Sequence, residues 1–490
     1  MELTYLSAIV FLPALGAVVI ALLSRPSPRL VRFVAAFFTL VPLAFSLRLF
    51  AAFDRSTGGW YEGVAGWLPA SLPVNFHLGV DGLSLPLVVL TGFLGFLVVL
   101  ISWKVELRVK EYFIWLLLLE TGIMGVFTSV DLLLFFLFWE VELVPMYLLI
   151  SIWGSGRKEY SAIKFVVFTL FGSAFMLAGI LALYFSTGTF NLHDLATMDL
   201  SGVSTVLPLT SIFLFIFLAF AVKLPMFPFH TWLPDAHTDA PTAVSVILAG
   251  VLLKMGGYGI IRINVGIFPQ VARDLAPYIA ALAVVSIIYG AAVTIRQKDL
   301  KRMIAYSSVS HMGYVLLGVF ALSHISMTGA ALQMVSHGFV TGLLFAMVGL
   351  VYDKTHNRNL DFLGGLARQM PVIAVVFTIA GLASLGLPGT SGFAAEVIVF
   401  LGSFSSTAFE AVRLYTVLGV VAIVLTAGYI LWMLQRTFYT EPLEKYDGVP
   451  DADALEKVSI FTFVAAIMVI GIYPAVVTDV IKLGVPALGF

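Results

Sequence analysis

The stretch Ala221-Val-Lys-Leu-Pro-Met-Phe-Pro-Phe-His-Thr-Trp-Leu-Pro-Asp-Ala-His237 places a lysine and two prolines at the end of an apolar run, 211–222. Pro225 and Pro228 lack an amide hydrogen and crowd the carbonyls four residues earlier, so we expect the helix to break beside Lys223. In hydrocarbon, the carbonyls freed by a break persist only where protein or water donates to them. A second lysine, Lys254, lies inside the next apolar segment. Two buried amines beside a broken helix indicate part of an ion path.

The composition is that of a polytopic membrane protein. Of 490 residues, 60% are hydrophobic and 11% are charged, with a mean hydropathy of +1.03, a balance that no soluble core of this size needs. The net charge of −1 gives no sign of nucleic-acid binding, and the absence of cysteine excludes disulfides, zinc thiolate sites and iron–sulfur ligation. The sequence contains neither a dinucleotide-binding glycine motif nor a Walker A loop.

The apolar segments predict fourteen membrane spans, since a span needs about 20 residues. The first begins with an acidic rather than a basic sequence, which favours a retained helix over a cleaved signal peptide. The expected spans are 4–23, 30–50, 82–102, 112–130, 132–152, 162–185, 209–237 (broken), 241–262, 274–295, 301–322, 325–351, 371–406 (broken), 412–436 and 457–481.

The distribution of Lys and Arg predicts the orientation. Of the 27 basic residues, 18 fall in the loops that begin after the first span and alternate from there, six fall in the other loops, and Lys164, Lys223 and Lys254 fall within spans. Under the positive-inside rule, both termini are expected outside, and this requires an even number of spans. The longer loops, 53–78 and 187–208 outside and 437–456 inside, are too short for separate domains.

The two breaks predict an internal repeat. The seventh span breaks at Pro225, and the twelfth breaks at Leu385-Gly-Leu-Pro-Gly-Thr-Ser391, five helices later. Interrupted helices at matching positions of two halves are typical of inverted-repeat transporters, whose sites lie near the membrane midplane. We therefore expect an all-α integral membrane fold in a single domain, 1–490, with repeats at 112–262 and 274–436.

Eight ionisable side chains fall inside the predicted spans. Each costs about 2.5–3.5 kcal/mol at the bilayer centre if it is charged and isolated, so these groups must pair, titrate or contact water. The charges also match the helix dipoles at the two breaks. Lys223 lies at the carboxyl end of a half-helix, which stabilises a cation, and Glu396 lies near the amino end of another, which stabilises an anion. The eight are Glu140, Glu142, Lys164, Lys223, Lys254, His311, His337 and Glu396.

Structural interpretations remain open for several of these groups. Lys223 and Lys254 are interpreted as proton-transfer groups, with a structural ion pair to a neighbouring helix as the alternative. Glu140 and Glu142 face different sides of a continuous helix, and we expect Glu140 to be the inward one. Lys164 lies near a helix end, where it could extend to the inner surface or take part in function.

The histidines present the same choice. His311 and His337 lie in adjacent spans between Lys254 and Glu396, which favours a proton relay over two satisfied core histidines. A second group, made of His230, Asp235, His237 and Asp239, has the composition of a metal site. Zinc requires its ligands to converge closely, so we interpret this proline-rich stretch as a hydrated access route instead.

Three motifs carry a resemblance to a known family. They are the quoted stretch 222–237, Ala240-Pro-Thr-Ala-Val-Ser-Val-Ile-Leu-Ala-Gly-Val-Leu-Leu-Lys254, and the run Trp139-Glu within span five. They resemble the antiporter-like membrane subunits of respiratory complex I, which are similar to the large subunits of Mrp-type sodium/proton antiporters. With glutamate at 396 and no long lateral helix after span fourteen, the chain looks like the M type. The resemblance covers nearly the whole chain and implies fourteen helices with an inverted five-helix repeat.

The resemblance also implies roles and partners. The proton-transfer residues would be Glu140, Lys223, Lys254, His311, His337 and Glu396. Flavin, iron–sulfur clusters and quinone would reside in partner subunits, with no cofactor or metal in this chain. L-type and N-type subunits would be its neighbours in a bacterial inner membrane, with both termini periplasmic.

The resulting hypothesis is proton translocation driven by redox chemistry in other subunits of an NADH–quinone oxidoreductase. Glu140 would keep Lys223 protonated until its charge is drawn away, and the proton would then pass through Lys254 and the histidines toward Glu396. Two alternatives remain: a subunit of an Mrp-type antiporter or membrane-bound hydrogenase, and a passive scaffold.

Overall fold

The computed structural model describes residues 2–56, 58–66 and 74–486. Within these ranges, twelve helices are long and apolar enough to cross a membrane, and two further crossings are made of shorter pieces, as predicted for segments seven and twelve. The predicted fourteen spans are therefore confirmed.

The first six crossings are α1 (Glu2–Leu22), α2 (Pro28–Ala52), α3 (Leu85–Ile101), α4 (Val109–Thr128), the pair α5 (Leu132–Val141) and α6 (Leu143–Trp153), and α7 (Lys158–Thr187). The seventh consists of α9 (Leu209–Lys223) and α10 (Trp232–Asp239), after a short surface helix α8 (Leu192–Thr197). The eighth runs through α11 (Thr242–Ile247), a π-helical turn (Leu248–Leu252), α12 (Leu253–Gly259) and a second π-helical turn (Ile260–Val265).

The ninth to eleventh crossings are α13 (Pro269–Ile295), α14 (Leu300–Phe320) and α15 (His324–Thr355). The twelfth is α16 (Pro371–Leu385) with α17 (Ser391–Ser405), the thirteenth α18 (Val412–Val421) with α19 (Ile423–Phe438), and the fourteenth α20 (Ala454–Ile472). Short 3-10 helices lie at Ser102–Lys104, Leu200–Gly202, Leu360–Phe362, Leu366–Arg368 and Glu444–Tyr446. The last span was expected to reach residue 481, but Pro474 interrupts it and a separate helix, α21 (Ala475–Gly484), follows.

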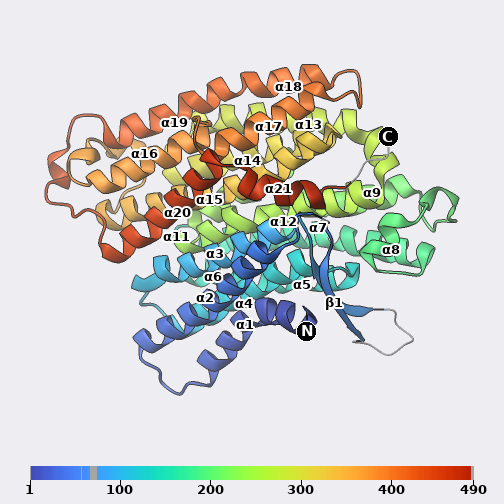
Figure 1. Ribbon diagram of the computed structural model, residues 1–490. Helices are drawn as coiled ribbons and strands as arrows, with labels where there is room; N and C mark the ends of the chain where they lie inside the picture. The colour runs from blue at the N-terminus through green and yellow to red at the C-terminus, as the bar shows by residue number, and fades with distance from the viewer. Residues whose placement is uncertain (1, 57, 67–73, 487–490) are drawn as a thin grey trace.

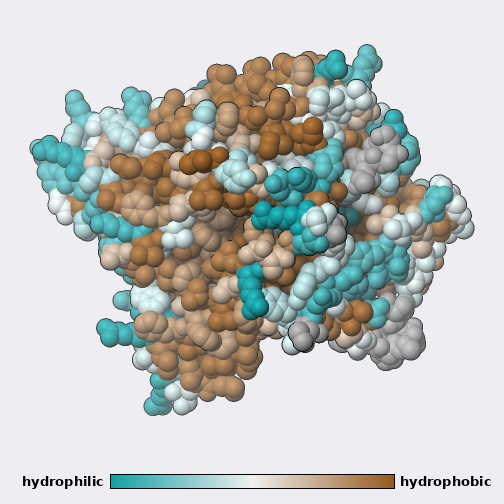
Figure 2. Space-filling view, viewed as in Figure 1, coloured by the Kyte–Doolittle hydropathy of each residue, from teal (hydrophilic) through white to brown (hydrophobic). Residues whose placement is uncertain are grey.

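The helices form one bundle whose most buried members lie in the middle. Figure 1 shows α1 and α2 at one side, α16, α18 and α19 at the opposite side, and α12 and α15 between them. The apolar stretch of the eighth crossing is completely buried, and so are 94% of the residues in the apolar stretch of α15. Hydrophobic residues cover much of the visible face between more hydrophilic ends (Figure 2), as a membrane-embedded bundle requires.

The first predicted break is confirmed. Helix α9 ends at Lys223, two residues before Pro225, and the freed carbonyls find donors inside the protein. The Met226 backbone N–H donates to the Ala221 carbonyl at 2.9 Å, and the Trp232 indole N–H donates to the Val222 carbonyl at 2.9 Å. The broken end is thus satisfied without lipid-exposed polar groups.

The second predicted break, in the twelfth crossing, is also confirmed. Helix α16 ends at Leu385, and the turn that follows uses Gly386 (φ +88°) and Gly389 (φ +91°), conformations that side chains with a Cβ rarely adopt. Helix α17 then restarts at Ser391 and carries Glu396 in its second turn. The predicted charge placement near a helix amino end is therefore correct.

A small extended layer closes one end of the bundle. Strands β1 (Tyr61–Gly66) and β2 (Asn75–Val80) form an antiparallel hairpin. The backbone of His77 accepts from Val130, and Val130 in turn accepts from Leu192. The hairpin, the start of α5 and the start of α8 are therefore tied together by backbone hydrogen bonds. Part of the predicted loop 53–78, residues 57 and 67–73, lies outside the described residues.

Candidate functional site: a buried row of ionisable groups

Lys223 forms a direct ion pair with Glu142 in the core of the bundle. Both side chains are almost completely buried, and the aromatic rings of Trp139 and Phe165 lie 5.2 and 5.4 Å from the Lys223 ammonium. Rings at this range stabilise a cation that has lost its water. The lysine predicted at the break is thus inside the protein, between a carboxylate and two aromatic rings.

The expectation that Glu140 faces inward, rather than Glu142, is wrong. It assumed a continuous helix, but α5 ends at Val141 and α6 begins at Leu143. Pro145 has no N–H for the Val141 carbonyl, which accounts for the interruption. The bend turns Glu142 inward, and the lack of a side chain at Gly122 of α4 lets that helix approach the Glu142 backbone closely.

Glu140, near the end of α5, is less buried than Glu142. It is half-buried, and Leu137 and Val144, which share its helix face by spacing, are 38% and 57% exposed. One Glu140 carboxylate oxygen is buried without a hydrogen-bond partner among the described residues. Glu142 is thus fully buried beside Lys223, whereas Glu140 lies between the core and the exposed face of the helix.

Lys254 lies between two π-helical turns, where the helix is locally widened. Its ammonium donates to the Ala249 carbonyl, five residues earlier, and contacts Nδ1 of His337 at 2.8 Å. Such π turns occur often at functional sites because they release backbone groups from the regular ladder. The predicted association of Lys254 with a histidine of the eleventh span is found directly.

The row continues from His337 to Glu396. The His337 and His311 rings lie 5.6 Å apart between centroids, and His311 Nδ1 lies 3.5 Å from a Glu396 carboxylate oxygen. Nε2 of His311 also contacts the Ser384 hydroxyl at 3.2 Å. Lys254, His337, His311 and Glu396 therefore form a row of neighbouring ionisable groups across three helices and a half-helix.

A small polar cavity adjoins this set. Its volume is about 10 Å³, close to that of a single water molecule. The residues that line it are His311, Gln333, Ser336, His337, Val340, Thr341, Ala383, Ser384, Gly392 and Glu396. A water there would have several polar partners between the histidines and the glutamate.

The two lysines lie on helices in close contact. A Cβ at Gly256 would lie 2.7 Å from the Phe220 carbonyl and 2.8 Å from the Leu224 amide nitrogen. Gly256 is two residues from Lys254, and Phe220 and Leu224 flank Lys223 in the sequence. This glycine therefore permits the approach of the broken seventh span to the eighth.

The residues predicted to form a hydrated access route, His230, Asp235, His237 and Asp239, have separate partners. Asp235 pairs with Lys164 at 2.7 Å and with Arg302 at 3.2 Å, and Asp239 accepts from the Ser161 hydroxyl at 2.6 Å. For Lys164 this is the contact of a structural ion pair. These bonds fasten α10, the second half of the broken span, to α7 and α14.

The two histidines of that group lie against aromatic rings. His230 lies beside Tyr289, with ring centroids 5.0 Å apart, and His237 stacks on Phe345 at 4.4 Å. Neither the histidines nor the two aspartates meet at a common point that would hold a metal ion among the described residues. The access route itself stays a prediction.

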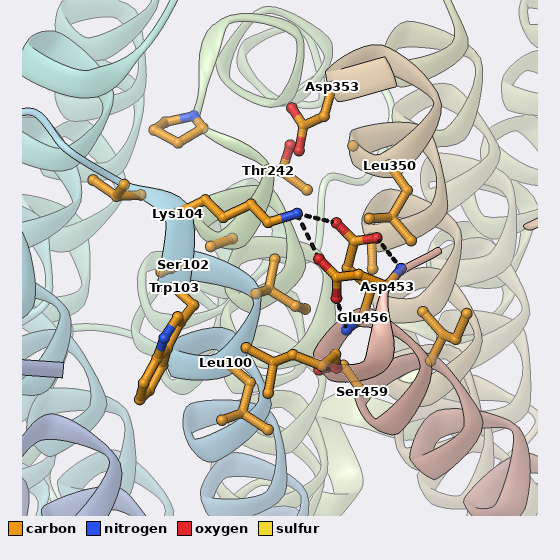
Figure 3. Close-up of a pocket in the computed structure, with 18 of the residues that line it drawn as sticks. Leu100, Ser102, Trp103, Lys104, Thr242, Leu350, Asp353, Asp453, Glu456 and Ser459 are labelled. Carbon is orange, nitrogen blue, oxygen red and sulfur yellow. Dashed lines mark hydrogen bonds and ion pairs between the residues drawn. The ribbon is translucent and has the colours of Figure 1, made fainter. Parts of the chain in front are cut away.

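A larger cavity of about 470 Å³ opens at the end of the bundle that carries most of the basic residues. Figure 3 shows Lys104 reaching between Asp453 and Glu456, with Asp353 and Thr242 above them. The ammonium lies 2.7 Å from Asp453 and 2.6 Å from Glu456. Thr242 begins the span that carries Lys254, so this cavity reaches the base of that helix.

Sequence analysis missed Glu120 and gave no role to Glu142. Glu120, in α4, is 2% exposed, and its carboxylate occupies the space left by the missing side chain of Gly95. Its isolated position in a leucine-rich span was a visible signal. For Glu142 the signal was Pro145, which predicts a bend at the acid.

Comparison with known proteins supports the geometry. A sequence model described as NADH:quinone oxidoreductase/Mrp antiporter, transmembrane, matches residues 129–426, more than half of the chain. The chain belongs to this family. The matched range includes Glu142, Lys223, Lys254, His311, His337 and Glu396.

Relatives within the NADH:quinone oxidoreductase/Mrp antiporter family match over nearly their full length. The NADH-quinone oxidoreductase subunit M of Rhodobacter capsulatus is 42% identical, with 97% of this chain and 94% of the relative covered. A NAD(P)H-quinone oxidoreductase chain 4 of Synechococcus elongatus is 43% identical, with 99% and 92% covered.

Solved structures give the same fold. A chain of respiratory complex I from Thermus thermophilus superposes with a TM-score of 0.86 at 29% identity, with 98% of both chains covered. A chain of the Mrp complex from Dietzia sp. superposes with a TM-score of 0.85 at 21% identity, covering 98% of this chain and 96% of that one. The predicted antiporter-like fold is confirmed.

Proposed function

We propose that this chain is a proton-translocating membrane subunit of an NADH–quinone oxidoreductase. The observation that carries the proposal is a set of buried ionisable groups on adjoining spans: the Glu142–Lys223 pair, and the row formed by Lys254, His337, His311 and Glu396. Ionisable groups are costly inside a membrane protein, and a connected set marks a proton path more readily than a structural role does.

In the proposed cycle, Glu142 stabilises the charged form of Lys223. When the pairing weakens, Lys223 loses its counter-charge and its proton passes toward Lys254. Lys254 then exchanges with His337, and His311 carries the proton to Glu396. The imidazoles suit this role because histidine titrates closer to neutral pH than the other side chains of the row.

The energies involved are sufficient. Moving one charge against about 200 mV costs about 4.6 kcal/mol. Burial alone shifts the proton affinity of a lysine by up to about 3–5 pKa units, equal to about 4–7 kcal/mol. Removal of a buried counter-charge is therefore enough, in principle, to expel a proton against the membrane potential.

Glu140 is proposed to receive the signal from a neighbouring subunit. Its half-buried position next to the exposed Leu137 and Val144 supports this role, because a partner helix that covers these residues would lie close to Glu140. L-type and N-type subunits are the proposed neighbours. The flavin, iron–sulfur clusters and quinone of the redox reaction are proposed to lie in partner subunits, since this chain has no cysteine.

The proposed setting is a bacterial inner membrane with both termini on the periplasmic side. The excess of Lys and Arg on one set of loops supports this orientation. The 470 Å³ cavity around Lys104 would then open to the cytoplasm, where protons enter.

The test is proton pumping by the assembled complex in sealed vesicles, with NADH oxidation measured in parallel. Lys223→Ala is expected to abolish pumping and to lower coupled quinone reduction, while the complex still assembles. Full pumping by an assembled Lys223→Ala complex would refute the proposal.

A second candidate is a subunit of a cation/proton antiporter or a membrane-bound hydrogenase, which would use the same groups with a different driver. The description of the matching family names both NADH:quinone oxidoreductase and Mrp antiporter, so it is consistent with this second function as well. Co-purification decides between them: a flavin and iron–sulfur assembly supports the oxidoreductase, and its absence supports the antiporter. A passive scaffold would instead keep pumping after Lys223 and Glu396 are both replaced.

A further inference from the structure

Three potential metal ligands converge outside the membrane-embedded row. Glu62 of β1, His77 of β2 and His193 of α8 present one carboxylate oxygen and two imidazole nitrogens, all within 4.8 Å of one another. Glu62 Oε2 lies 3.0 Å from His77 Nε2 and 2.8 Å from His193 Nε2. The proton path does not use these residues.

The surrounding backbone holds the three side chains in place. In the hairpin register Glu62 pairs with Gly79 and Val64 pairs with His77, so Glu62 and His77 are diagonal neighbours on one face. His193 follows Asn191, whose side-chain oxygen caps the start of α8 by accepting from the His193 N–H at 2.8 Å. Ligands from three separately anchored segments therefore meet at one point before any ion is added.

We propose that Glu62, His77 and His193 form a binding site for a divalent transition metal, with Zn²⁺ as the bound ion. Two imidazoles and one carboxylate are a known zinc donor set in which the fourth position is open to water. Hard cations such as Mg²⁺ and Ca²⁺ prefer oxygen ligands, so two nitrogens favour zinc. At metal–ligand bonds of about 2.0–2.2 Å, tetrahedral ligand atoms lie about 3.4 Å apart. The two Glu62 contacts, at 3.0 and 2.8 Å, would lengthen by about half an ångström, and the two imidazole nitrogens already lie within 4.8 Å of each other.

The site is accessible from solvent. His77 is buried, whereas the side chains of His193 and Glu62 are 34% and 36% exposed. An ion can therefore enter from the His193 side, and a water molecule can complete its coordination. Binding would join the hairpin to α8 and stabilise the extended layer at the start of α5.

One contact opposes metal binding. The Asn191 amide nitrogen faces His77 Nδ1 at 3.4 Å, which favours a proton on His77 Nε2. Binding through Nε2 moves that proton to Nδ1 and sacrifices this long contact. Without an ion, the same geometry fits two imidazole N–H groups that donate to Glu62, and the experiment must separate these two states.

The experiment measures Zn²⁺ binding to the full-length chain in detergent after treatment with a chelator. We expect one saturable Zn²⁺ per chain, a higher melting temperature with Zn²⁺ and not with Mg²⁺, and X-ray absorption that shows nitrogen and oxygen ligands at about 2.0–2.2 Å. His193→Gln and Glu62→Gln are expected to weaken binding at least about tenfold. The matched control is His324→Gln, which removes an exposed histidine at the start of α15 that is not one of the three converging ligands.

Two results would overturn the proposal. One is the absence of saturable Zn²⁺ binding by a wild-type chain that melts cooperatively. The other is binding that survives both His193→Gln and Glu62→Gln, which would place the ion elsewhere. Each variant is melted without Zn²⁺ first, and because His193 is partly exposed, its replacement tests the site even if Glu62→Gln folds poorly.

Discussion

Lys223 pairs with Glu142 and not with Glu140, although the two acids are only two residues apart. Glu142 lies at the junction of α5 and α6 and is fully buried, whereas Glu140, just before the junction, is half-buried. The acid that pairs with Lys223 and the acid nearer the protein surface are therefore different residues.

The first prediction separates the two acids. Glu142→Gln leaves Lys223 buried without its counter-charge, so it should cost about 3–5 kcal/mol of stability and abolish proton translocation. Glu140→Gln keeps the Lys223–Glu142 pair and should leave the melting temperature within about 2 °C of wild type, the effect of a change below about 0.5 kcal/mol. Thermal melting of the purified chain and pumping by the assembled complex measure the two effects. Equal destabilisation by both variants would contradict the assignment.

The second prediction concerns Lys254. Lys254→Arg keeps a positive charge next to His337, but a guanidinium does not release its proton in proteins. Pumping should therefore be lost to the same extent as in Lys254→Met. If Lys254→Arg pumps at the wild-type rate, a fixed charge is sufficient and Lys254 does not transfer a proton. Native-gel analysis of assembly is the control for both variants.

The third prediction concerns the far end of the row. Glu396→Gln removes the carboxylate that faces His311 at 3.5 Å, so the rate of proton transfer should fall about 100-fold, as for loss of a positioned acid or base. Glu410→Gln is the matched control, since Glu410 is an exposed acid in the loop after the same broken span. A similar loss in both variants would indicate a nonspecific effect of charge.

The fourth prediction tests helix packing through a pair of glycines. A Cβ at Gly402 would lie 2.2 Å from the Ser326 backbone nitrogen, whereas a Cβ at Gly428 would meet no atom within 4 Å. Gly402→Ala should destabilise the chain by about 1–3 kcal/mol. Gly428→Ala should be neutral or stabilise it by up to about 1 kcal/mol through helix propensity. Melting temperatures in detergent give both values, and a stable Gly402→Ala variant would disprove the close approach of α17 to α15.

Much of the architecture could be predicted from local sequence. Proline chemistry located the end of α9 at Lys223, and the glycines at 386 and 389 located the second break. The same local signals placed Lys223 and Glu396 at helix ends of matching polarity. The repeat boundaries at 112–262 and 274–436 stay a prediction.

The contacts between groups could not be predicted in this way. The sequence placed Glu140 and Glu142 on different sides of the fifth helix and favoured Glu140 as the inward acid, whereas Lys223 pairs with Glu142. It grouped His230, Asp235, His237 and Asp239 by proximity along the chain, yet Asp235 pairs with basic residues of two other helices. It gave no sign that Glu62, His77 and His193 would meet, since their segments are up to 131 residues apart.

The sequence by itself determined that this protein spans a membrane fourteen times, breaks two of its helices and carries ionisable groups within them, because hydrophobic length, proline and glycine act locally. Only the tertiary structure decided which acid meets Lys223 and that Lys254, His337, His311 and Glu396 adjoin. Those contacts depend on how far each helix rotates and how closely neighbouring backbones approach, and many side chains set these quantities together.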